Sequence, residues 1–403
     1  MDALKRNIKI DYIYCFIRNF DISSAIWVLY MVYKGLPLWQ IGIIEGIFHT
    51  TSFIFEVPSG AWADLFGRKK VMVAGRGACA VSALILLFSN HFLGFAIGFI
   101  ISAIGYNLNS GSEEALVYDS MKQAGIEEEY LKVNSKLNLI IEISQGLGTF
   151  IGGILAEQSF VYCYVSVIGI SLISLLPCLM FREPSIQKKK RERVSLGEHF
   201  KVCFRILKDN PKILKVLLYF PLVFTFNTVV FFYGQQYYLT EGCNKVEISL
   251  IMLFSGGISC IGALTCEMVL SRLKKKTKYV ASIMMGICIV LVSSNQLWIS
   301  ILAFAGMSYA NALLYPIQST SLNRLIPSEQ RATMISVDSM VFSLIMIVIF
   351  PICGVIADIV NLHVMFLGLG VLQITLSLCI YFYSCDILGL GIQWCKSKLV
   401  KGE

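Results

Sequence analysis

Apolar stretches of about twenty residues recur from one end of this chain to the other, separated by short polar breaks. A helix of that length crosses the ~30 Å of hydrocarbon in a lipid bilayer, because each residue adds 1.5 Å of rise. Only 15% of the 403 residues are charged and 56% are hydrophobic, whereas soluble domains carry about 25% charged residues. The chain is therefore predicted to lie in a membrane and not to form a soluble enzyme.

The spacing of these stretches predicts twelve transmembrane spans. They run at about 11–33, 38–63, 71–90, 92–119, 133–157, 160–181, 213–240, 246–271, 278–294, 297–323, 333–358 and 362–385. Strand-like alternation is absent from them, and helices satisfy the backbone hydrogen bonds that lipid cannot provide. The predicted fold is an all-α membrane protein with twelve transmembrane helices in two pseudo-symmetric six-helix bundles.

The two predicted bundles comprise residues 1–181 and 213–403, and residues 182–212 form a basic cytoplasmic linker between them. Weakly similar segments support this division. ADLFGRKKV (63–71) follows the second span, and LSRLKKKTK (270–278) follows the eighth span at the equivalent place in the other half. Parallel repeats of six spans are what a transporter built from two bundles leaves in its sequence.

Basic residues are distributed unevenly between the two predicted sides of the membrane. Of the 34 Lys and Arg residues, all except Arg18, Lys34, Arg76 and Lys245 lie in or beside the N-terminus, the even-numbered breaks or the C-terminus. The positive-inside rule then places both chain ends in the cytoplasm. We expect a multi-pass protein of a bacterial inner membrane. The net charge of +8 belongs to this pattern, so nucleic acid is not an expected partner.

The 13 cysteines are scattered singly and lack the CxxC or Cys/His spacing of metal sites. The sequence also lacks a recognisable Ser/His/Asp set, Walker-type sequence or phosphate-binding glycine loop. We therefore expect no metal, no cofactor, and neither enzymatic nor ATP-driven activity.

The loop between the second and third spans carries a recognisable motif. The run GAWADLFGRKKV (60–71) resembles the GxLaDrxGrkxx motif of the major facilitator superfamily. Together with twelve spans, a central basic loop and a degenerate second copy of the motif, the resemblance covers the whole chain. It implies a secondary transporter that works by alternating access.

The resemblance also implies a cytoplasmic gate that closes in the outward-facing state. Gly60 would let the second span approach the eleventh, and Asp64 would face the positive N-terminal end of the eleventh helix. Gly67 would make the tight turn, and Arg68 would pair with Asp119 at the end of the fourth span. Such a half-buried acid–base set must break when the two bundles part.

The fifth span contains the glycine-rich run SQGLGTFIGGILA (144–156). This run resembles the fifth-helix motif of antiporters in the same superfamily, although the usual proline is missing. Glycines in membrane helices also serve ordinary close packing. The run is therefore compatible with antiport and with a purely structural role.

Ionisable side chains at the centre of a span cost at least ~2.5–3.5 kcal/mol, so each should have a partner or a function. Glu56 and Arg76 lie at similar predicted depths on the second and third spans, and we expect them to form a structural ion pair. Arg18 and Asp21 are three residues apart in the first span, which would place them on one helix face.

Carboxylates outnumber cations within the spans of the N-terminal half, which favours proton coupling. Asp21 is the preferred proton-coupling group, together with Arg18, although Asp21 could serve only as a partner of Arg18. Glu113 and Glu114 follow, and because adjacent helical residues point ~100° apart, only one of them can face a cavity. Glu142 of the fifth span completes the predicted set.

In the C-terminal half, amide and aromatic side chains fall on single faces of two spans. They are Asn227, Phe231, Gln235 and Tyr238 on the seventh span, and Asn311, Tyr315 and Gln318 on the tenth. Buried amides without partners are unfavourable, so a wet substrate cavity is one explanation and ordinary aromatic packing is the other. Relatives in the superfamily bind substrate between spans 1, 4, 7 and 10, which adds Trp27, Asn107 and Ser110.

These features favour a proton-coupled secondary transporter whose two bundles rock about a central cavity. The expected partners are a small-molecule substrate, protons and membrane lipids, and the chain is expected to act as a monomer. By resemblance to drug:proton antiporters, efflux of amphipathic or cationic compounds is preferred. Uptake of a small metabolite by symport, lipid flipping, and a non-transporting partner role are the alternatives.

Overall fold

The computed structural model describes residues 2–184, 211–326 and 331–401, and its regular elements in these ranges are all helices. Each predicted span contains one helix or two consecutive ones. The first half contains α1 (Asp2–Asn19), α2 (Trp27–Tyr33), α3 (Leu38–Phe66), α4 (Arg68–Phe88), α5 (Phe92–Gln123), α6 (Tyr130–Gln158), α7 (Phe160–Ile173) and α8 (Leu175–Met180). The second half contains α10 (Pro211–Thr240), α11 (Lys245–Leu273), α12 (Thr277–Val292), α13 (Leu297–Leu325), α14 (Arg331–Ile359) and α15 (Leu362–Lys401).

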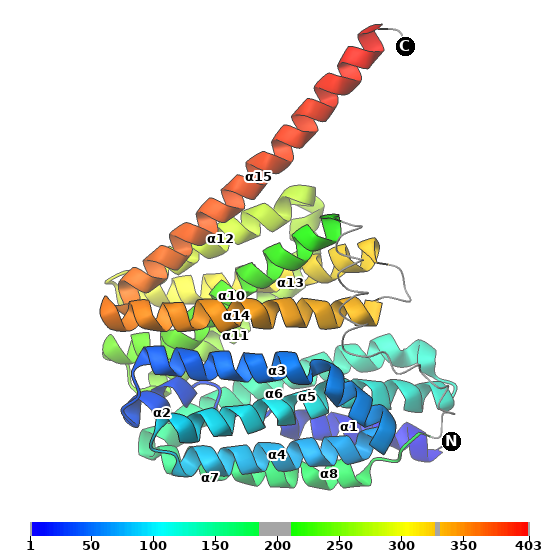
Figure 1. Cartoon of the computed structure of the whole chain (residues 1–403), viewed down its shortest axis with the longest axis vertical. Coiled ribbons are helices and arrows are strands. Elements are labelled where there is room, and N and C mark those ends of the chain that lie inside the picture. Colours follow the sequence, from blue (N-terminus) through cyan, green and yellow to red (C-terminus); the bar gives the residue numbers. More distant parts are fainter. Residues whose placement is uncertain (1, 185–210, 327–330, 402–403) are drawn as a thin grey trace.

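The two halves lie one above the other in Figure 1, with α1–α8 below and α10–α15 above. They meet along two pairs of helices, α3 with α14 and α6 with α11. Most of the predicted linker, 182–212, lies outside the described residues. Following the charge distribution, we call the end of the bundle that carries the turn at Gly67 the inner end. The opposite end, which carries residues 34–37, is the outer end.

The first span is broken, which the sequence analysis did not predict. α1 ends at Asn19 and α2 begins at Trp27, so residues 20–26 are not helical. The Asp21 side chain accepts hydrogen bonds from the Ser23 backbone N–H at 2.9 Å and from its hydroxyl at 2.6 Å. Short polar side chains compete with helical bonding in this way. The expected i, i+3 relation of Arg18 and Asp21 is therefore wrong, because Asp21 lies beyond the helix end.

The glycine-rich run of the fifth span is explained by close packing against this break. A Cβ on Gly148 would lie 2.7 Å from the Asp21 backbone nitrogen, and one on Gly152 would lie 2.1 Å from the Ile22 carbonyl oxygen. Ser144, one turn earlier, donates to the Phe16 carbonyl. One face of α6 therefore supports the unwound backbone of the first span.

We predict that Gly152→Ala destabilises the protein by ~1–3 kcal/mol, the usual cost of overpacking. The added methyl group would overlap the Ile22 carbonyl oxygen, which is a backbone atom and not the end of a flexible side chain. Thermal unfolding of the purified variant in detergent would show a melting temperature several degrees lower. Gly169→Ala on α7 is the matched control, because a Cβ there meets nothing within 4 Å. Equal melting temperatures for the two variants would contradict this account of the break.

Candidate transport site

The outer halves of α3 and α14 pack backbone to backbone. A Cβ on Gly42 would lie 2.8 Å from Pro351 Cα, and one on Gly354 would lie 2.5 Å from the Leu38 carbonyl oxygen. The hydroxyl of Tyr233, from α10, donates to the Phe350 carbonyl at 3.1 Å beside this contact. The two halves of the protein are therefore in direct contact at the outer end.

Two carboxylates strengthen this outer contact, and the sequence analysis missed both. Asp358, at the end of α14, accepts from the Trp39 backbone N–H at the start of α3, at 2.7 Å. Glu157, at the end of α6, accepts from the Lys245 backbone N–H at the start of α11, at 2.9 Å. Each carboxylate thus sits at the positive N-terminal end of a helix from the other half. We call these two contacts the outer latches.

The outer latches occupy equivalent positions in the two halves. The run GGILAE (152–157) ends the fifth span, and the run CGVIAD (353–358) ends the eleventh. The two runs are 201 residues apart, close to the 207 residues that separate ADLFGRKKV and LSRLKKKTK. Gly153 and Gly354 are equivalent in this alignment, and each makes a close contact with the opposite half, through Ser249 and Leu38 respectively. This repeat is the sequence signal by which the latches could have been found.

At the inner end, two of the predicted gate contacts are present within the first half. Gly67 has φ +93°, which suits the tight turn expected there. The Arg68 guanidinium bonds to the Asp119 carboxylate and to the Ala115 carbonyl. Glu183, which the sequence analysis did not single out, accepts from the Arg68 backbone N–H at 2.8 Å and caps the start of α4.

Two further gate contacts are predicted between the second and eleventh spans, at Gly60 and Asp64. A Cβ on Gly60 would meet nothing within 4 Å among the described residues. Asp64 is exposed. The first side chains of α14, which Asp64 is expected to face, lie outside the described side chains. The role of Gly60 and Asp64 in an outward-facing state stays a prediction.

Arg18 forms an ion pair with Glu113, not with Asp21. Its Nη1 lies 2.8 Å from Glu113 Oε2, and both side chains are largely buried between α1 and α5. Glu114 points away from this pair, is exposed and accepts from the Tyr130 hydroxyl at 2.9 Å. The two adjacent glutamates therefore diverge, as their helical spacing predicts, and only Glu113 faces the first span.

The predicted Glu56–Arg76 ion pair is not formed. Arg76 Nε donates to the Ser174 hydroxyl at 2.6 Å, inside the first half. Glu56 instead hydrogen-bonds with Ser336 of α14, across the contact between the halves. The short loop between the spans sets the depth of both residues but not the direction in which each side chain points. Glu142 is exposed on α6.

The predicted substrate residues divide into two groups, and the first is accessible or has free hydrogen-bonding capacity. Tyr315 is 65% exposed and Ser110 is exposed. The side-chain oxygens of Asn227 and Asn311 are buried and have no hydrogen-bond partner among the described residues. Phe231 is partly buried and stacks on the buried ring of Phe304 at 6.0 Å.

The second group is buried in structural contacts, so these residues do not line an open cavity in this conformation. Trp27 packs edge-on against Phe232 of the other half, with ring centroids 5.2 Å apart. Gln235 donates to the Ser24 carbonyl at 2.8 Å, and so satisfies part of the broken first span. These two residues join the halves near the break.

Asn107, Tyr238 and Gln318 are buried within their own halves. Asn107 donates to the Ser52 carbonyl at 2.7 Å, and Tyr238 donates to the Ser300 carbonyl at 3.2 Å. Gln318 donates to the carboxylate of Asp338 at 2.8 Å. Helical spacing predicts that these residues share a helix face with the other predicted substrate residues. The edges of such a face contact neighbouring helices, and these residues lie there.

Two residues that were not predicted belong to the accessible group. Tyr106 on α5 is 57% exposed and lies 6.3 Å, between ring centroids, from Phe48. It is within electrostatic range of Tyr315 on the other half. Asp338 of α14 is bound by Gln318 and is also within electrostatic range of Tyr315. Exposed tyrosines of the two halves thus lie near each other, and Tyr315 lies near the half-buried acid Asp338.

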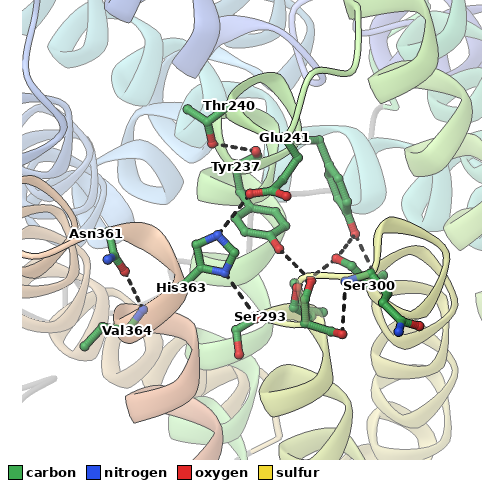
Figure 2. A network of polar contacts seen from close by, with 12 residues as sticks. Tyr237, Thr240, Glu241, Ser293, Ser300, Asn361, His363 and Val364 are labelled. Atoms are coloured by element: carbon green, nitrogen blue, oxygen red, sulfur yellow. Dashed lines mark hydrogen bonds and ion pairs between the residues drawn. The ribbon is translucent and has the colours of Figure 1, made fainter.

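The outer end of the second half is held by a separate polar network, drawn in Figure 2. His363 Nε2 lies 2.9 Å from Glu241, and its Nδ1 lies 3.1 Å from the Ser293 carbonyl oxygen. A cavity of about 450 Å³ lies beside it, lined by both halves and including Asp358 and Gln236. The network ties α10, α12 and α15 together at the outer surface.

Comparison with known proteins decides the class of this chain. The pattern that defines the Major Facilitator Superfamily matches residues 13–294. The chain belongs to the Major Facilitator Superfamily. It is 23% identical over 358 residues to YxaM of Bacillus subtilis (strain 168), an uncharacterized MFS-type transporter, covering 87% of this chain and 88% of YxaM. It is 26% identical over 206 residues to MJ1560 of Methanocaldococcus jannaschii, another uncharacterized MFS-type transporter, covering 49% and 50% of the two chains.

Solved structures agree with this assignment at the level of the fold. The nucleoside transporter NupG superposes with a TM-score of 0.75 at 14% identity, covering 94% of this chain and 98% of NupG. A D-xylose–proton symporter gives 0.71 at 14% identity, covering 93% and 96%. The predicted class, a multi-pass membrane transporter and not an enzyme, is confirmed.

We predict that removing the outer latches by Glu157→Ala and Asp358→Ala opens the outer end. Loss of each capping carboxylate costs ~0.5–2 kcal/mol, and this cost falls only on the outer-closed state. Cys353, which is 2% exposed beside this contact, should react severalfold faster with a small thiol reagent, as measured by mass spectrometry of the labelled peptide. Glu247→Ala is the control, because Glu247 caps only its own helix α11. An unchanged rate in the double variant would refute the latch role.

Proposed function

We propose that this protein is a proton-coupled secondary transporter that moves an amphipathic or cationic small molecule by alternating access. The observation that carries the proposal is the ion pair of Arg18 and Glu113, buried inside the membrane region at 2.8 Å. A charged pair at this depth is costly to maintain, and such residues are typical of proton and substrate pathways. It lies in the half that also contains the exposed carboxylates of Asp21 and Glu142.

Proton binding would act through this pair. Protonation of Glu113 removes its negative charge and releases Arg18, which changes the packing of α1 against α5. Glu114 and Glu142, which are exposed, and Asp21, at the break, are the further proton-coupling candidates. Asp21 remains of particular interest because a break in a membrane helix places backbone and carboxylate together near the midplane.

The side chains of the accessible group favour a substrate with a positive charge and an apolar body. Tyr106 and Tyr315 are exposed on the two halves, and aromatic faces attract cations. The amide oxygens of Asn227 and Asn311, which have no hydrogen-bond partner among the described residues, supply additional acceptors. Acceptors and aromatic rings in combination suit an organic cation better than an anion. With protons available on the outer side, exchange for such a cation would result in efflux.

Uptake by proton symport is the second candidate. The glycine run of the fifth span, which resembles an antiporter motif, packs against the first span and α11, so it does not by itself favour antiport. The Arg18–Glu113 pair would serve either direction, and a D-xylose–proton symporter shares the fold. Lipid flipping remains the third possibility to be tested.

Alternating access would use the two ends of the α3–α14 pair in turn. With the outer latches formed, as here, the outer end is closed. In the opposite state the outer latches would be broken, and Gly60 and Asp64 would contact the start of α14. The contacts that would close each end of the protein all come from one chain, which supports a monomer as the working unit. The monomer would lie in the lipid of the cell membrane with both termini on the cytoplasmic side.

Proteoliposomes with an imposed pH gradient test the function, with tetraphenylphosphonium as the probe. Opposite movement of protons and probe is expected for the proposed antiporter, and movement in the same direction would establish symport. Glu113→Gln should abolish gradient-driven accumulation. Movement of labelled lipid between leaflets without any proton flux would replace the proposal with a flippase.

We predict that Tyr106→Ala and Tyr315→Ala each weaken binding of tetraphenylphosphonium by about 5- to 30-fold. The estimate follows from ~1–2 kcal/mol for a partly desolvated cation–π contact. Equilibrium binding to purified protein gives the dissociation constants. Tyr162→Ala on α7 is the control, because Tyr162 is similarly exposed, at 54%, but lies at the outer surface of the first half. Equal affinities for all three variants would rule out the tyrosines as substrate contacts.

A further inference from the structure

Asp11, in the middle of α1, is the least exposed carboxyl group among the described side chains of the first half. Asp11 is 0% exposed, and neither of its carboxylate oxygens has a hydrogen-bond partner among the described residues. An isolated carboxylate in such surroundings would be very unfavourable. Asp11 must therefore be protonated in this conformation or share a neighbouring positive charge.

Asp11 belongs to a polar stripe on one face of α1, because its members are three or four residues apart. The members are Asn7, Asp11, Tyr14 and Arg18. All except Asp11 bond to α5: Asn7 to Ser120 at 2.8 Å, Tyr14 to Asn109 at 2.6 Å, and Arg18 to Glu113 at 2.8 Å. Asp11 thus faces α5 between Asn7 and Tyr14, each of which forms a hydrogen bond with α5.

The helix register places Asp11 close to Glu113. The bond between Asn7 and Ser120 fixes one common level of the two antiparallel helices. Asp11 lies four residues, or ~6 Å, above that level on α1, and Glu113 lies seven residues, or ~10 Å, above it on α5. The two carboxyl groups therefore differ in depth by only ~4 Å. Each is within electrostatic range of the other.

Arg18 is positioned to serve both acids. Long side chains on a helix point back toward its N-terminus, which is the direction of Asp11. The guanidinium is bonded to Glu113 through Nη1, and its Nε is buried without an acceptor among the described residues. One unsatisfied donor of Arg18 and two unsatisfied acceptor atoms of Asp11 thus lie on the same face of one helix.

We propose that Asp11 is a proton-binding residue and that Arg18 moves between Glu113 and Asp11 during transport. In the conformation described here, Arg18 neutralises the Glu113 carboxylate and Asp11 carries a proton. When Glu113 takes up a proton, it releases Arg18, which moves to Asp11, and Asp11 loses its proton as the guanidinium arrives. One proton is bound and one is released, so the set stays neutral at each exchange. This inference rests on the proposed proton coupling and names a second proton site for it.

Other titratable groups near the set do not replace this exchange. Arg76 of α4 is held by hydrogen bonds to Ser174 and Ser171, so it contributes a fixed positive charge. The other groups within electrostatic range of the set are phenols and thiols, not carboxyl groups: Tyr12, Tyr14, Cys15, Cys79, Tyr106, Tyr130 and Cys178. Glu114 of α5 is also within electrostatic range of Glu113, but it is exposed and accepts a hydrogen bond from Tyr130.

Infrared difference spectroscopy of the purified protein in lipid tests the inference without any substrate. A protonated carboxyl group gives a C=O stretch that is separate from the carboxylate bands, and ¹³C-labelled aspartate shifts it. We expect this labelled band in the wild-type protein at neutral pH and its loss in Asp11→Asn. We also expect its loss in Glu113→Gln, in which Asp11 itself is unchanged, because the freed Arg18 would ionise Asp11. Ser120→Ala should keep the band.

Two outcomes would overturn the inference. A spectrum of Asp11→Asn that keeps the whole aspartic C=O band shows that Asp11 is not the protonated group. A band that persists in Glu113→Gln shows that Arg18 does not move to Asp11. In proteoliposomes, Asp11→Asn is expected to lose accumulation driven by a pH gradient but to retain probe exchange. If no probe moves with protons while the infrared results hold, the proposed function fails and the proton site stands.

Discussion

Backbone amide groups cannot remain unpaired inside a membrane, and this constraint governs the centre of the protein. The first span is not helical between Asn19 and Trp27, so the backbone groups there lack helical hydrogen bonds. Its free groups are partly satisfied by the Asp21 side chain and by Gln235 from the opposite half. The missing side chains of Gly148 and Gly152 let α6 cover the break directly. The break, the glycine run and the buried glutamine are consequences of one requirement.

A similar requirement applies to charge. Membrane-embedded charged groups persist when they find partners. Glu45 and His49 are paired along α3, whereas two other contacts join different helices. Arg18 bonds to Glu113 on α5, and Gln318 bonds to Asp338 on α14. Such pairs couple the protonation of one residue to the packing of two helices. That coupling is what a transporter needs if a proton is to change its shape.

The class of fold could be predicted from the sequence because hydrophobic length and charge distribution are one-dimensional properties. The family motif likewise predicted the Gly67 turn and the Arg68–Asp119 pair, since both are local to neighbouring helix ends. Depth along a span could also be estimated, but rotation about the helix axis could not. That is why Arg76 was assigned to Glu56 when it faces Ser174. For the same reason, the predicted substrate stripe includes Asn107, Tyr238 and Gln318, which form hydrogen bonds within their own halves in this conformation.

Asp11 and the outer carboxylates were missed for different reasons. The first span was predicted to begin at Asp11, and polar residues are common at the ends of membrane spans. In the structure α1 begins at Asp2, so Asp11 lies in the middle of the helix. Glu157 and Asp358 lay at the outer span ends, where acids are ordinary. Their role depends on a helix terminus in the other half, which no local pattern describes. Only the repeat of GGILAE and CGVIAD marked them as a pair.

The donors of the outer latches are main-chain groups, and this affects how the protein can evolve. Replacing the side chain of Trp39 or Lys245 leaves each donor in place, because any residue except proline supplies the same N–H. At the latch between Asp358 and Trp39, only the acid is under selection, so this contact should not appear as correlated substitutions between the two halves. Lys245 also places its ammonium group 4.0 Å from Glu157, so compensating changes of charge are expected at that latch alone.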